Sequence, residues 1–552
     1  MTDRSLRAPR WLVLGAIGLI AIGCLLRFSG LGQFAPWYDE VVTLKHLAVQ
    51  SDADLAQAWA GREWVLADLW QSLATEPRKT AFDTIQSLAG GNAHHPPLYY
   101  LVVRAWADWF GNTIVSLRLV TALIGVALLP CTFWLLRQVS DRPSLPWIGT
   151  ALVALSPLQI LYAQEAREYA LWLVFFVLSS GLLAQALGRS SWQRWTLYGL
   201  ALTATWYSHL LGGLVLVGHG LWVVQGVRRS PDRSWRRAVP WAIAAIGTFL
   251  AISPWLWMLY QARVTASGAL QWLSSSPLPG IQRWAALRAM AAMVLDNQPS
   301  IWKSFPAPTD SGRLAIVGLA VVAVVRCWRS SEPRLKAFVL TTIAPFLLML
   351  WLPAFLADRS MAAIVRYELP MILALQVALA DWIAALCDRF QPKPALEWPQ
   401  PLSFYLFRWR WMPQVFAGGL AIVLVFSTLT AAKARSWQPT WWTKGGSNQI
   451  NIAKALKKVD QPLILSSPVP GEYPNILALS YAFDRLKIRN TQFVLIPNPL
   501  QTVLPDRPNT FVVNPSPELK QAIEQRSGKR LIPAGKDWWQ LWRIEPAGPG
   551  QR

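Results

Sequence analysis

The sequence predicts an all-α polytopic membrane protein that carries a small α/β domain at its C-terminal end. Hydrophobic residues make up 53% of the 552 residues, and they gather in runs near the length of about 20 residues that crosses a bilayer as a helix. From about residue 440 onward, polar sequence with short β-rich runs replaces the apolar runs. We therefore expect a transmembrane catalytic domain over residues 1–432 and a small extracytoplasmic domain over residues 433–552.

The formal net charge of +22 comes with a clustering of Lys and Arg in short segments between apolar runs. This clustering is typical of cytoplasmic loops, so it accounts for the charge without a nucleic-acid partner. The 33 Trp and 12 Tyr suit side chains that lie at the two membrane interfaces. The four cysteines lie within or at the ends of apolar runs, and they offer neither a disulfide framework nor a CxxC metal site.

The first apolar run extends from Trp11 to Leu26 behind a short basic start. No small-residue cleavage site follows it, so it predicts a retained membrane helix. If this helix runs outward from the cytoplasm, residues 28–97 form a long extracytoplasmic loop, in which acidic residues outnumber basic ones. The next stretch, residues 98–110, contains Arg104 and Asp108 and is too short to cross, which predicts a helix lying in the interface. The alternative is a true short span, which would invert every later helix.

Later apolar runs bring the predicted total to about eleven spans. They cover about 114–136, 145–163, 169–188, 196–208, 210–227, 238–260, 313–327, 335–356, 368–387 and 413–432. If the first helix runs outward and residues 98–110 do not cross the membrane, the strongly basic loops lie in the cytoplasm. The loops at 164–168, 209, 261–312 and 358–368 then lie outside. We expect a multi-pass protein of the inner (plasma) membrane, with its active site and C-terminal domain on the extracytoplasmic, periplasmic side.

The C-terminal region shows the pattern of a small α/β domain. Strands are expected at 463–465, 493–496, 511–513 and 539–544, and helices at 451–458 and 518–526.

Asp39 and Glu40 are adjacent carboxylates just beyond the first span, after Pro36 and the aromatic pair Trp37-Tyr38. They are predicted to begin a helix, where the helix dipole stabilises carboxylates as anions. An ionised carboxylate beside a partly dry groove can serve as a general base toward a hydroxyl or an amine. The structural alternative is a helix cap.

Other outer loops supply polar residues at the same expected membrane level. His94 and His95 precede two prolines that start the next helix, and either histidine could bind a cation or a phosphate unless both are ordinary loop residues. A charged cluster from Gln164 to Tyr169 lies between two spans, where charges are costly unless they pair or act; local pairing of Glu165 with Arg167 is the structural alternative.

His209 follows Trp206-Tyr207-Ser208 at the same expected level. Arg366, beside Tyr367, is suited to hold a phosphate, because a guanidinium group matches phosphate oxygens with two parallel hydrogen bonds. Together the outer loops supply carboxylates for a base and cations for an anionic leaving group. A site that takes a sugar from a lipid phosphate needs both, with the lipid chain lying between helices.

The sequence resembles the GT-C membrane glycosyltransferases over about residues 11–432, specifically glycosyltransferase family 39 and its bacterial relatives. These include the aminoarabinose transferases and the protein mannosyltransferases. The markers occur in the order of the family: Asp39-Glu40, HHPPLYY (His94 to Tyr100), Leu117-Arg118-Leu119, SPLQILYAQEAREYAL (Ser156 to Leu171), Tyr207-Ser208-His209 and Arg366-Tyr367.

The resemblance implies an inverting transfer of a sugar from a polyprenyl-phosphate donor to a lipid, glycan or protein acceptor outside the cytoplasm. It implies that Asp39, with Glu40 beside it, acts as the general base. By position it places Arg366 on the lipid phosphate, with help from Arg167, His95 and Tyr367.

Other residues complete the implied site: His94, Glu165 and His209, with Glu168 as an alternative to Glu165. We expect no obligatory cofactor, because a phosphate monoester leaving group needs less cationic help than a diphosphate; a divalent metal stays open.

Two other classes of function are compatible with the pattern. A transporter or flippase of lipid-linked sugars would use the same charges to line a path, with discontinuous helices and charges at the middle of the membrane. An inactive scaffold would use the outer domain to bind a partner. The charges of this chain fall at the ends of spans on one side, which favours the transferase.

Overall fold

A computed structural model describes residues 8–33, 36–74, 78–263, 310–353, 365–389, 446–467, 472–496, 498–534 and 541–546. The chain divides into two compact units. We call the first the helical unit, which draws on residues 1–29, 92–99 and 118–433. We call the second the sheet unit, which draws on residues 30–91, 100–117 and 434–552.

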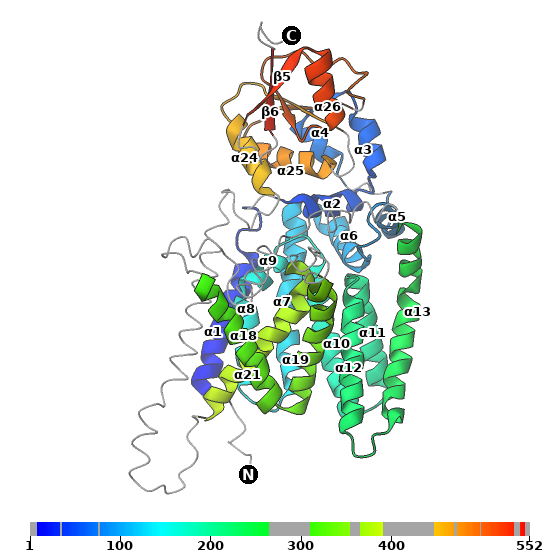
Figure 1. The fold of residues 1–552 in the computed structure, drawn as a ribbon, viewed down its shortest axis with the longest axis vertical. Coiled ribbons are helices and arrows are strands. Elements are labelled where there is room, and N and C mark those ends of the chain that lie inside the picture. The colour runs from blue at the N-terminus through cyan, green and yellow to red at the C-terminus, as the bar shows by residue number, and fades with distance from the viewer. Residues whose placement is uncertain are drawn as a thin grey trace, which may run out of the picture. The chain divides into compact units, whose positions relative to one another are not determined.

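The helical unit consists largely of apolar helices (Figure 1). They are α1 (Arg10–Phe28), the body of α7 (Ile114–Val139), α8 (Leu145–Leu155), α9 (Pro157–Ala163), α10 (Tyr169–Gly188), α11 (Trp192–Ser208), α12 (Gly212–Arg229), α13 (Val239–Gln261), α18 (Asp310–Ser330), α19 (Pro333–Phe346) with a π turn (Leu347–Trp351), and α21 (Leu369–Arg389). Short 3-10 turns at Trp235–Ala238 and Val365–Glu368 precede α13 and α21. Helix starts follow the sequence, as where Ser191 caps α11 by accepting a hydrogen bond from the Arg194 N–H.

Among the described residues, six helices are long and apolar enough to cross a membrane, or seven if α8 and α9 count as one span. The helices α11 and α12 match the spans predicted at 196–208 and 210–227, but they are not among those six. The span predicted at 413–432 lies outside the described residues. The total of about eleven spans therefore stays a prediction.

The span predicted at 145–163 is divided between two helices. Helices α8 and α9 meet at a bend of 63°, and together they are apolar and long enough to count as one span. Pro157 has no N–H with which to continue the helical hydrogen bonding, and Ser156 before it is extended. Ser156 Oγ instead caps α9 by accepting from the Gln159 N–H at 3.4 Å. The bend turns the chain just before the charged cluster at 164–168.

A buried arginine joins the end of α1 to this bend. Arg27 donates from Nη1 to the carbonyls of Gly23 at 2.8 Å and Ala154 at 2.7 Å, and from Nη2 to the carbonyl of Val153 at 3.2 Å. Gln164 Nε2 donates to three carbonyl groups at the end of α1. These contacts satisfy carbonyls that a helix end leaves without partners, and they hold the bent segment against α1.

The sheet unit combines helices from both ends of the chain. They are α2 (Tyr38–Leu47), α3 (Asp52–Trp59), α4 (Leu66–Gln71), α5 (Ala81–Gly91), most of α6 (Leu98–Phe110), α24 (Gly446–Leu456), α25 (Glu472–Arg485) and α26 (Pro517–Gln521), which continues as a π turn (Ala522–Arg526). The helix expected in the interface is α6, and its two charges, Arg104 and Asp108, pair at 3.0 Å. Its place at an interface stays a prediction.

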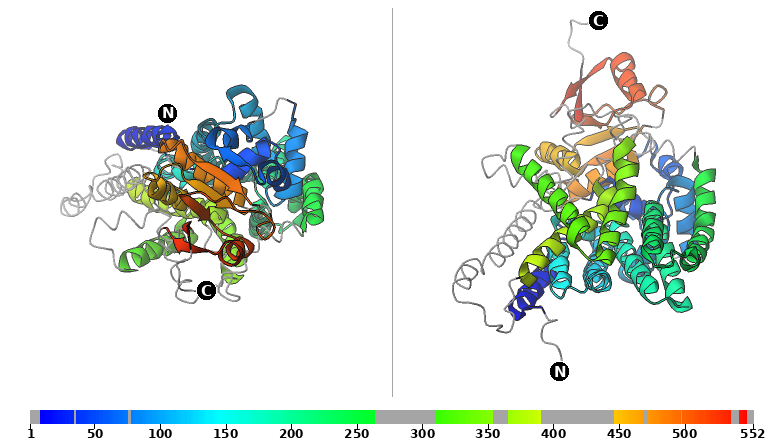
Figure 2. Two further views of the ribbon diagram at one scale, coloured as in Figure 1. Left: turned by 90° about the horizontal axis from the view of Figure 1, so that it is seen from above. Right: turned by 60° about the horizontal axis from the view of Figure 1, so that its bottom comes forward.

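Six strands form one mixed sheet in the order β1-β3-β2-β4-β6-β5 (Figures 1 and 2). They are β1 (Glu63–Val65), β2 (Leu463–Ser466), β3 (Gln492–Leu495), β4 (Thr510–Val513), β5 (Lys529–Pro533) and β6 (Leu541–Pro546). The central strands β3, β2 and β4 are parallel, and the outer strands pair antiparallel. The strands β2, β3 and β4 lie at the stretches where the sequence predicts them.

Helices cover both faces of the central strands. Leu519 and Ile523 join Leu463, Val494 and Val512 in a buried apolar cluster on one face. On the other face, the rings of Phe483 in α25 and Phe493 in β3 meet edge to face at 5.9 Å. The alternation of side chains along each strand separates the two faces.

The structure groups the first long loop differently from the expected domain boundary. We expected residues 28–97 to belong to the membrane domain, whereas residues 30–91 belong to the sheet unit. The loop contributes β1, which pairs with β3 through Glu63 opposite Val494, and α2 and α4 pack against α25. Three residues of regular alternation are too short a signal for a strand, so the sequence pattern did not reveal this one.

A carboxyl group lies half-buried at the start of α25. Glu472 accepts hydrogen bonds from Asn514 Nδ2 at 2.9 Å and from Asn475 Nδ2 at 3.2 Å. Asn475 in turn accepts from Gln449 Nε2 at 3.4 Å. Burial raises the pKa of Glu472 to about 7, since both amide donors only partly offset the loss of solvent.

We predict that Glu472→Gln removes a pH dependence of stability. The folded carboxyl group binds its proton more tightly than the unfolded one, so the free energy of unfolding falls by about 3 kcal/mol as pH rises from about 4.5 to 7. The neutral amide cannot show this loss. The measurement is the midpoint of thermal unfolding of the full chain in detergent at pH 5 and pH 8. Glu524→Gln, on an exposed turn, is the matched control, and equal pH shifts in all three proteins would contradict the prediction.

Candidate functional site

The helical unit brings residues from four separate turns to one place. The turn before α6 carries His94 and His95, and the turn between α9 and α10 carries residues 164–168. The turn between α11 and α12 carries His209, and the 3-10 turn before α21 carries Arg366 and Tyr367. All four lie at ends of packed helices. The bent pair α8 and α9, held by Arg27, sets the second turn.

Arg167 and Glu168, both buried, form a polar group with the half-buried His95. Arg167 Nε lies 3.2 Å from Glu168 Oε2, and Nη2 lies 3.2 Å from Glu168 Oε1, so the guanidinium contacts both carboxylate oxygens. His95 Nδ1 lies 2.9 Å from Glu168 Oε1, and Arg167 Nη2 lies 3.1 Å from His95 Nε2. One neutral tautomer fits both contacts: Nδ1–H donates to Glu168, and Nε2 accepts from Arg167. Arg167 and Glu168 are each 0% exposed. Two opposite charges buried in this way must neutralise each other.

The histidine turn is fixed by its neighbours. The backbone N–H of His95 donates to the Asn92 carbonyl at 2.9 Å, and Trp255 Nε1 donates to the Ala93 carbonyl at 3.1 Å. The ring of His94 lies 4.2 Å from that of His95. Helix α13, which carries Trp255, therefore holds this turn at the site.

His209 is a neutral ring at the centre of the group. It stacks on Trp172 with ring centroids 4.3 Å apart and an angle of 18°, and its ring lies 5.7 Å from that of Tyr367. Burial lowers the pKa of His209 to about 4, and Glu168, Arg167, Arg366 and His94 lie close enough to act on it as charges. The Leu211 N–H donates to Nδ1 at 3.2 Å, so the neutral ring carries its proton on Nε2.

Arg366 places a second guanidinium in the same group. Its Cζ lies 5.4 Å from the centre of the Tyr367 ring, within the range of a cation–π contact. The neighbouring Glu368 is buried and accepts from Trp351 Nε1 at 2.7 Å, which anchors the turn. Two arginines, Arg167 and Arg366, thus approach one neutral histidine among apolar helices, an arrangement suited to an anion.

Asp39 and Glu40, the two carboxylates that the sequence predicted for the site, both lie in α2 but in different environments. Glu40 is fully buried, and its Oε2 accepts from the Trp37 N–H at 3.3 Å as part of a capping box, which is the structural alternative for this residue. Asp39 is half-buried in the first turn of α2, and its carbonyl accepts from Thr43 Oγ1 at 3.2 Å. Both residues belong to the sheet unit. Asp39 is the better candidate for chemistry of the two.

Two residues of the group have a larger part than the sequence predicted. Glu168, which we treated as an alternative to Glu165, makes the contacts with Arg167 and His95 given above. Glu165 is also buried, and its carbonyl accepts from the Arg167 N–H at 2.7 Å. Trp172 was missed, because an aromatic residue in an apolar span carries no signal for a site. The spacing of two glutamates three residues apart does not reveal which one faces inward once the helix is broken.

Among the residues that the structure describes, no three His, Cys, Asp or Glu side chains are grouped so that they could hold a metal ion. The expectation of a reaction without an obligatory metal stays a prediction.

No protein-family model and no curated protein matches the chain. Among solved structures, ArnT from Cupriavidus metallidurans bound to undecaprenyl phosphate aligns with a TM-score of 0.52 and 14% identity, covering 96% of this chain and 97% of that one. The same ArnT in the apo state aligns with a TM-score of 0.51 and 13% identity, covering 97% and 98%. An archaeal oligosaccharyltransferase, AglB from Archaeoglobus fulgidus, aligns with a TM-score of 0.46 and 12% identity, covering 84% and 63%. The likeness to ArnT confirms the predicted GT-C fold.

We predict that Glu168→Gln destabilises the folded protein by about 3–5 kcal/mol, because it leaves the Arg167 guanidinium buried without the carboxylate that contacts it. The double variant Arg167→Met with Glu168→Gln is expected to cost clearly less than the two single changes together. Thermal unfolding of the purified protein measures this cycle. Asp232→Asn, in an exposed pair with Arg237, serves as a control and is expected to change stability by less than about 1 kcal/mol. Strictly additive single costs would show that the pair is not coupled.

Proposed function

We propose that the protein is an inverting glycosyltransferase of the inner membrane, which moves a sugar from a polyprenyl phosphate to an acceptor on the extracytoplasmic face. The observation that carries the proposal is the polar group of Arg167, Glu168, His95, His209 and Arg366. Two guanidinium groups and one carboxylate leave this group with net positive charge, and such a group at helix ends suits a phosphate whose lipid chain lies among apolar helices. The shared fold with ArnT, which was crystallised with undecaprenyl phosphate, supports the same class of donor.

In this proposal Arg366 holds the donor phosphate, and Arg167 adds positive charge. The surroundings exclude water, so each charge acts through a low dielectric and gains strength toward a leaving phosphate. Glu168 and His95 keep Arg167 in one orientation, as the contacts around its guanidinium suggest. Tyr367 and His209 form the aromatic and neutral polar wall, and His94 and Glu165 line the adjoining turns.

Asp39 accepts the proton of the acceptor in this proposal. The acceptor oxygen or nitrogen attacks the anomeric carbon of the donor, the bond from that carbon to the phosphate oxygen breaks, and the configuration inverts. The released polyprenyl phosphate carries the negative charge to the arginines. Asp39 acts as the base in its ionised form, and it lies in the first turn of α2. Glu40 supports this position by capping the same turn.

The acceptor is a lipid, a glycan or a protein in this proposal, and its chemistry must offer a nucleophilic hydroxyl or amine. The reaction as written needs no metal, because one monoester phosphate leaves and two guanidinium groups face it. A transporter of lipid-linked sugars would bind the same donor but release it unchanged, so label transfer separates the two functions.

We predict that Asp39→Asn lowers the rate of sugar transfer by about 10²–10⁴, since the amide cannot accept the proton. The assay supplies a panel of radiolabelled polyprenyl-phosphate sugars and an acceptor membrane extract, and it measures label moved to the extract. Glu63→Gln makes the same chemical change at an exposed carboxylate of β1 and is expected to keep full transfer. A folded Asp39→Asn protein with wild-type transfer would exclude the base role, and the absence of transfer from every donor would favour the transporter.

We predict that Arg366→Gln weakens binding of undecaprenyl phosphate by about tenfold to a hundredfold, because it removes charge-assisted hydrogen bonds to the phosphate. Binding is measured on the purified protein without sugar, so the result does not depend on transfer. Arg263→Gln, at the exposed end of α13, is the control. Equal affinities of the two variants would move the phosphate away from Arg366.

A further inference from the structure

A second concave site lies at the other end of the same helices. It is a cavity of about 820 Å³ where α10 and α12 end and where α11, α13 and α19 begin. Helix α11 runs from this cavity to the His209 turn, a distance of about 25 Å along its axis. The cavity is therefore separate from the candidate functional site.

Arginines line this cavity from three elements. Arg229 ends α12, Arg236 and Arg237 lie in the 3-10 turn before α13, and Arg334 lies in the first turn of α19. One lining carboxylate, Asp232, pairs with Arg237 at 3.2 Å. Positive charge therefore exceeds negative charge at the cavity, and an exposed pair of this kind is weak enough to yield to a ligand.

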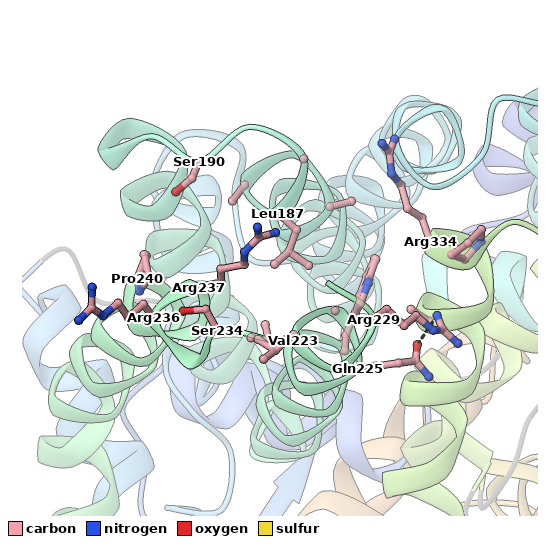
Figure 3. A pocket seen from close by; sticks show the side chains of 18 of the residues that line it. Leu187, Ser190, Val223, Gln225, Arg229, Ser234, Arg236, Arg237, Pro240 and Arg334 are labelled. Atoms are coloured by element: carbon pink, nitrogen blue, oxygen red, sulfur yellow. Dashed lines mark hydrogen bonds between the residues drawn. The ribbon is translucent and has the colours of Figure 1, made fainter. Parts of the chain in front are cut away.

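Figure 3 shows how the cationic groups are arranged. The guanidinium of Arg237 extends toward Leu187, and Arg229 bonds to Gln225 at 3.2 Å on the other side of the pocket. Arg334 projects from the first turn of α19. Cations thus face the cavity from opposite walls.

The inner part of the cavity is apolar. Its lining includes Ala184 and Leu187 of α10, Val223 of α12, and the buried rings of Trp195 and Trp222. A free inorganic anion would gain no binding energy from these apolar side chains. A ligand that carries an anionic head and an apolar body matches both parts of the site.

The surface around the cavity has the composition expected at the level of lipid headgroups. Trp192 and Trp235 are 73% and 59% exposed beside it, as is typical of Trp at a membrane interface. Farther along α11 and α13, Leu200 and Ile243 expose apolar side chains. These exposed faces suit acyl chains that continue from the cavity.

We propose that this cavity binds the phosphate headgroup of an anionic glycerophospholipid, whose acyl chains lie along the apolar outer faces of α11 and α13. The lipid joins the turn before α13 to the start of α19, because both supply arginines to one headgroup. The site is independent of the transferase function. Basic pockets between membrane helices are suited to such headgroups, and each arginine near the headgroup adds to the affinity.

The test compares phosphatidylglycerol with phosphatidylcholine of identical acyl chains, bound to the delipidated full chain in detergent and counted by native mass spectrometry. The wild type is expected to bind phosphatidylglycerol at least about tenfold more tightly. The double variant Arg237→Gln with Arg334→Gln is expected to lose this preference. The control double variant Arg228→Gln with Arg329→Gln removes the same charge from exposed arginines that do not line the cavity, and it is expected to keep the preference.

A second measurement uses only the wild type, so it does not depend on the folding of a variant. Phosphatidylglycerol is expected to protect Arg237 and Arg334 from phenylglyoxal, while Arg228 and Arg329 stay reactive. Equal affinities for the two lipids, equal losses in both double variants, or uniform protection would overturn the proposal. Displacement of phosphatidylglycerol by millimolar inorganic phosphate would show that the site takes a soluble anion, which would also overturn it.

Discussion

The buried contact between Arg167 and Glu168 is the constraint on which the candidate site depends. Two opposite charges removed from water are tolerated only when they neutralise each other, and here Arg167 Nη2 donates to Glu168 Oε1 while Nε lies 3.2 Å from Oε2. The contact fixes the turn between α9 and α10. Arg167 and Glu168, which lie in this turn, also fix His95, because its ring contacts both of them. His209 then lies within reach of the same charges.

The helices that hold this contact in place are interrupted rather than continuous. Pro157 ends one helix and starts the next, and Arg27 covers the carbonyl groups that the bend and the end of α1 leave exposed. The polar groups of an irregular backbone must be satisfied within an apolar bundle. A bent segment tied in this way can hold charged residues at one end of the bundle with little freedom.

Much of the fold could be predicted from the sequence, because the length and periodicity of apolar runs indicate helices directly. The motifs from Asp39 to Arg366 also indicated the GT-C fold, and the likeness to ArnT confirms it. The contacts of Glu168 and Arg27 were not accessible, since they depend on which residue faces inward after a bend. The grouping of residues 30–91 with the C-terminal strands could not be predicted from the sequence either. The strand β1 has only three residues, and its partner β3 is far away in the sequence. Pairing across such a separation leaves no local pattern.

That pairing has a consequence for how the protein is made. In the sheet that the structure describes, β1 is an edge strand whose partner is β3. Because most of the sequence lies between the two strands, β3 leaves the ribosome long after β1. Until β3 has been synthesised, the segment containing α2 and β1 therefore keeps its strand edge and apolar side chains exposed. Loops that fold early and late in one unit are prone to wrong partners during synthesis. The Asp39 turn, which packs on α25 through α2, therefore acquires its final environment only after α25 has been synthesised.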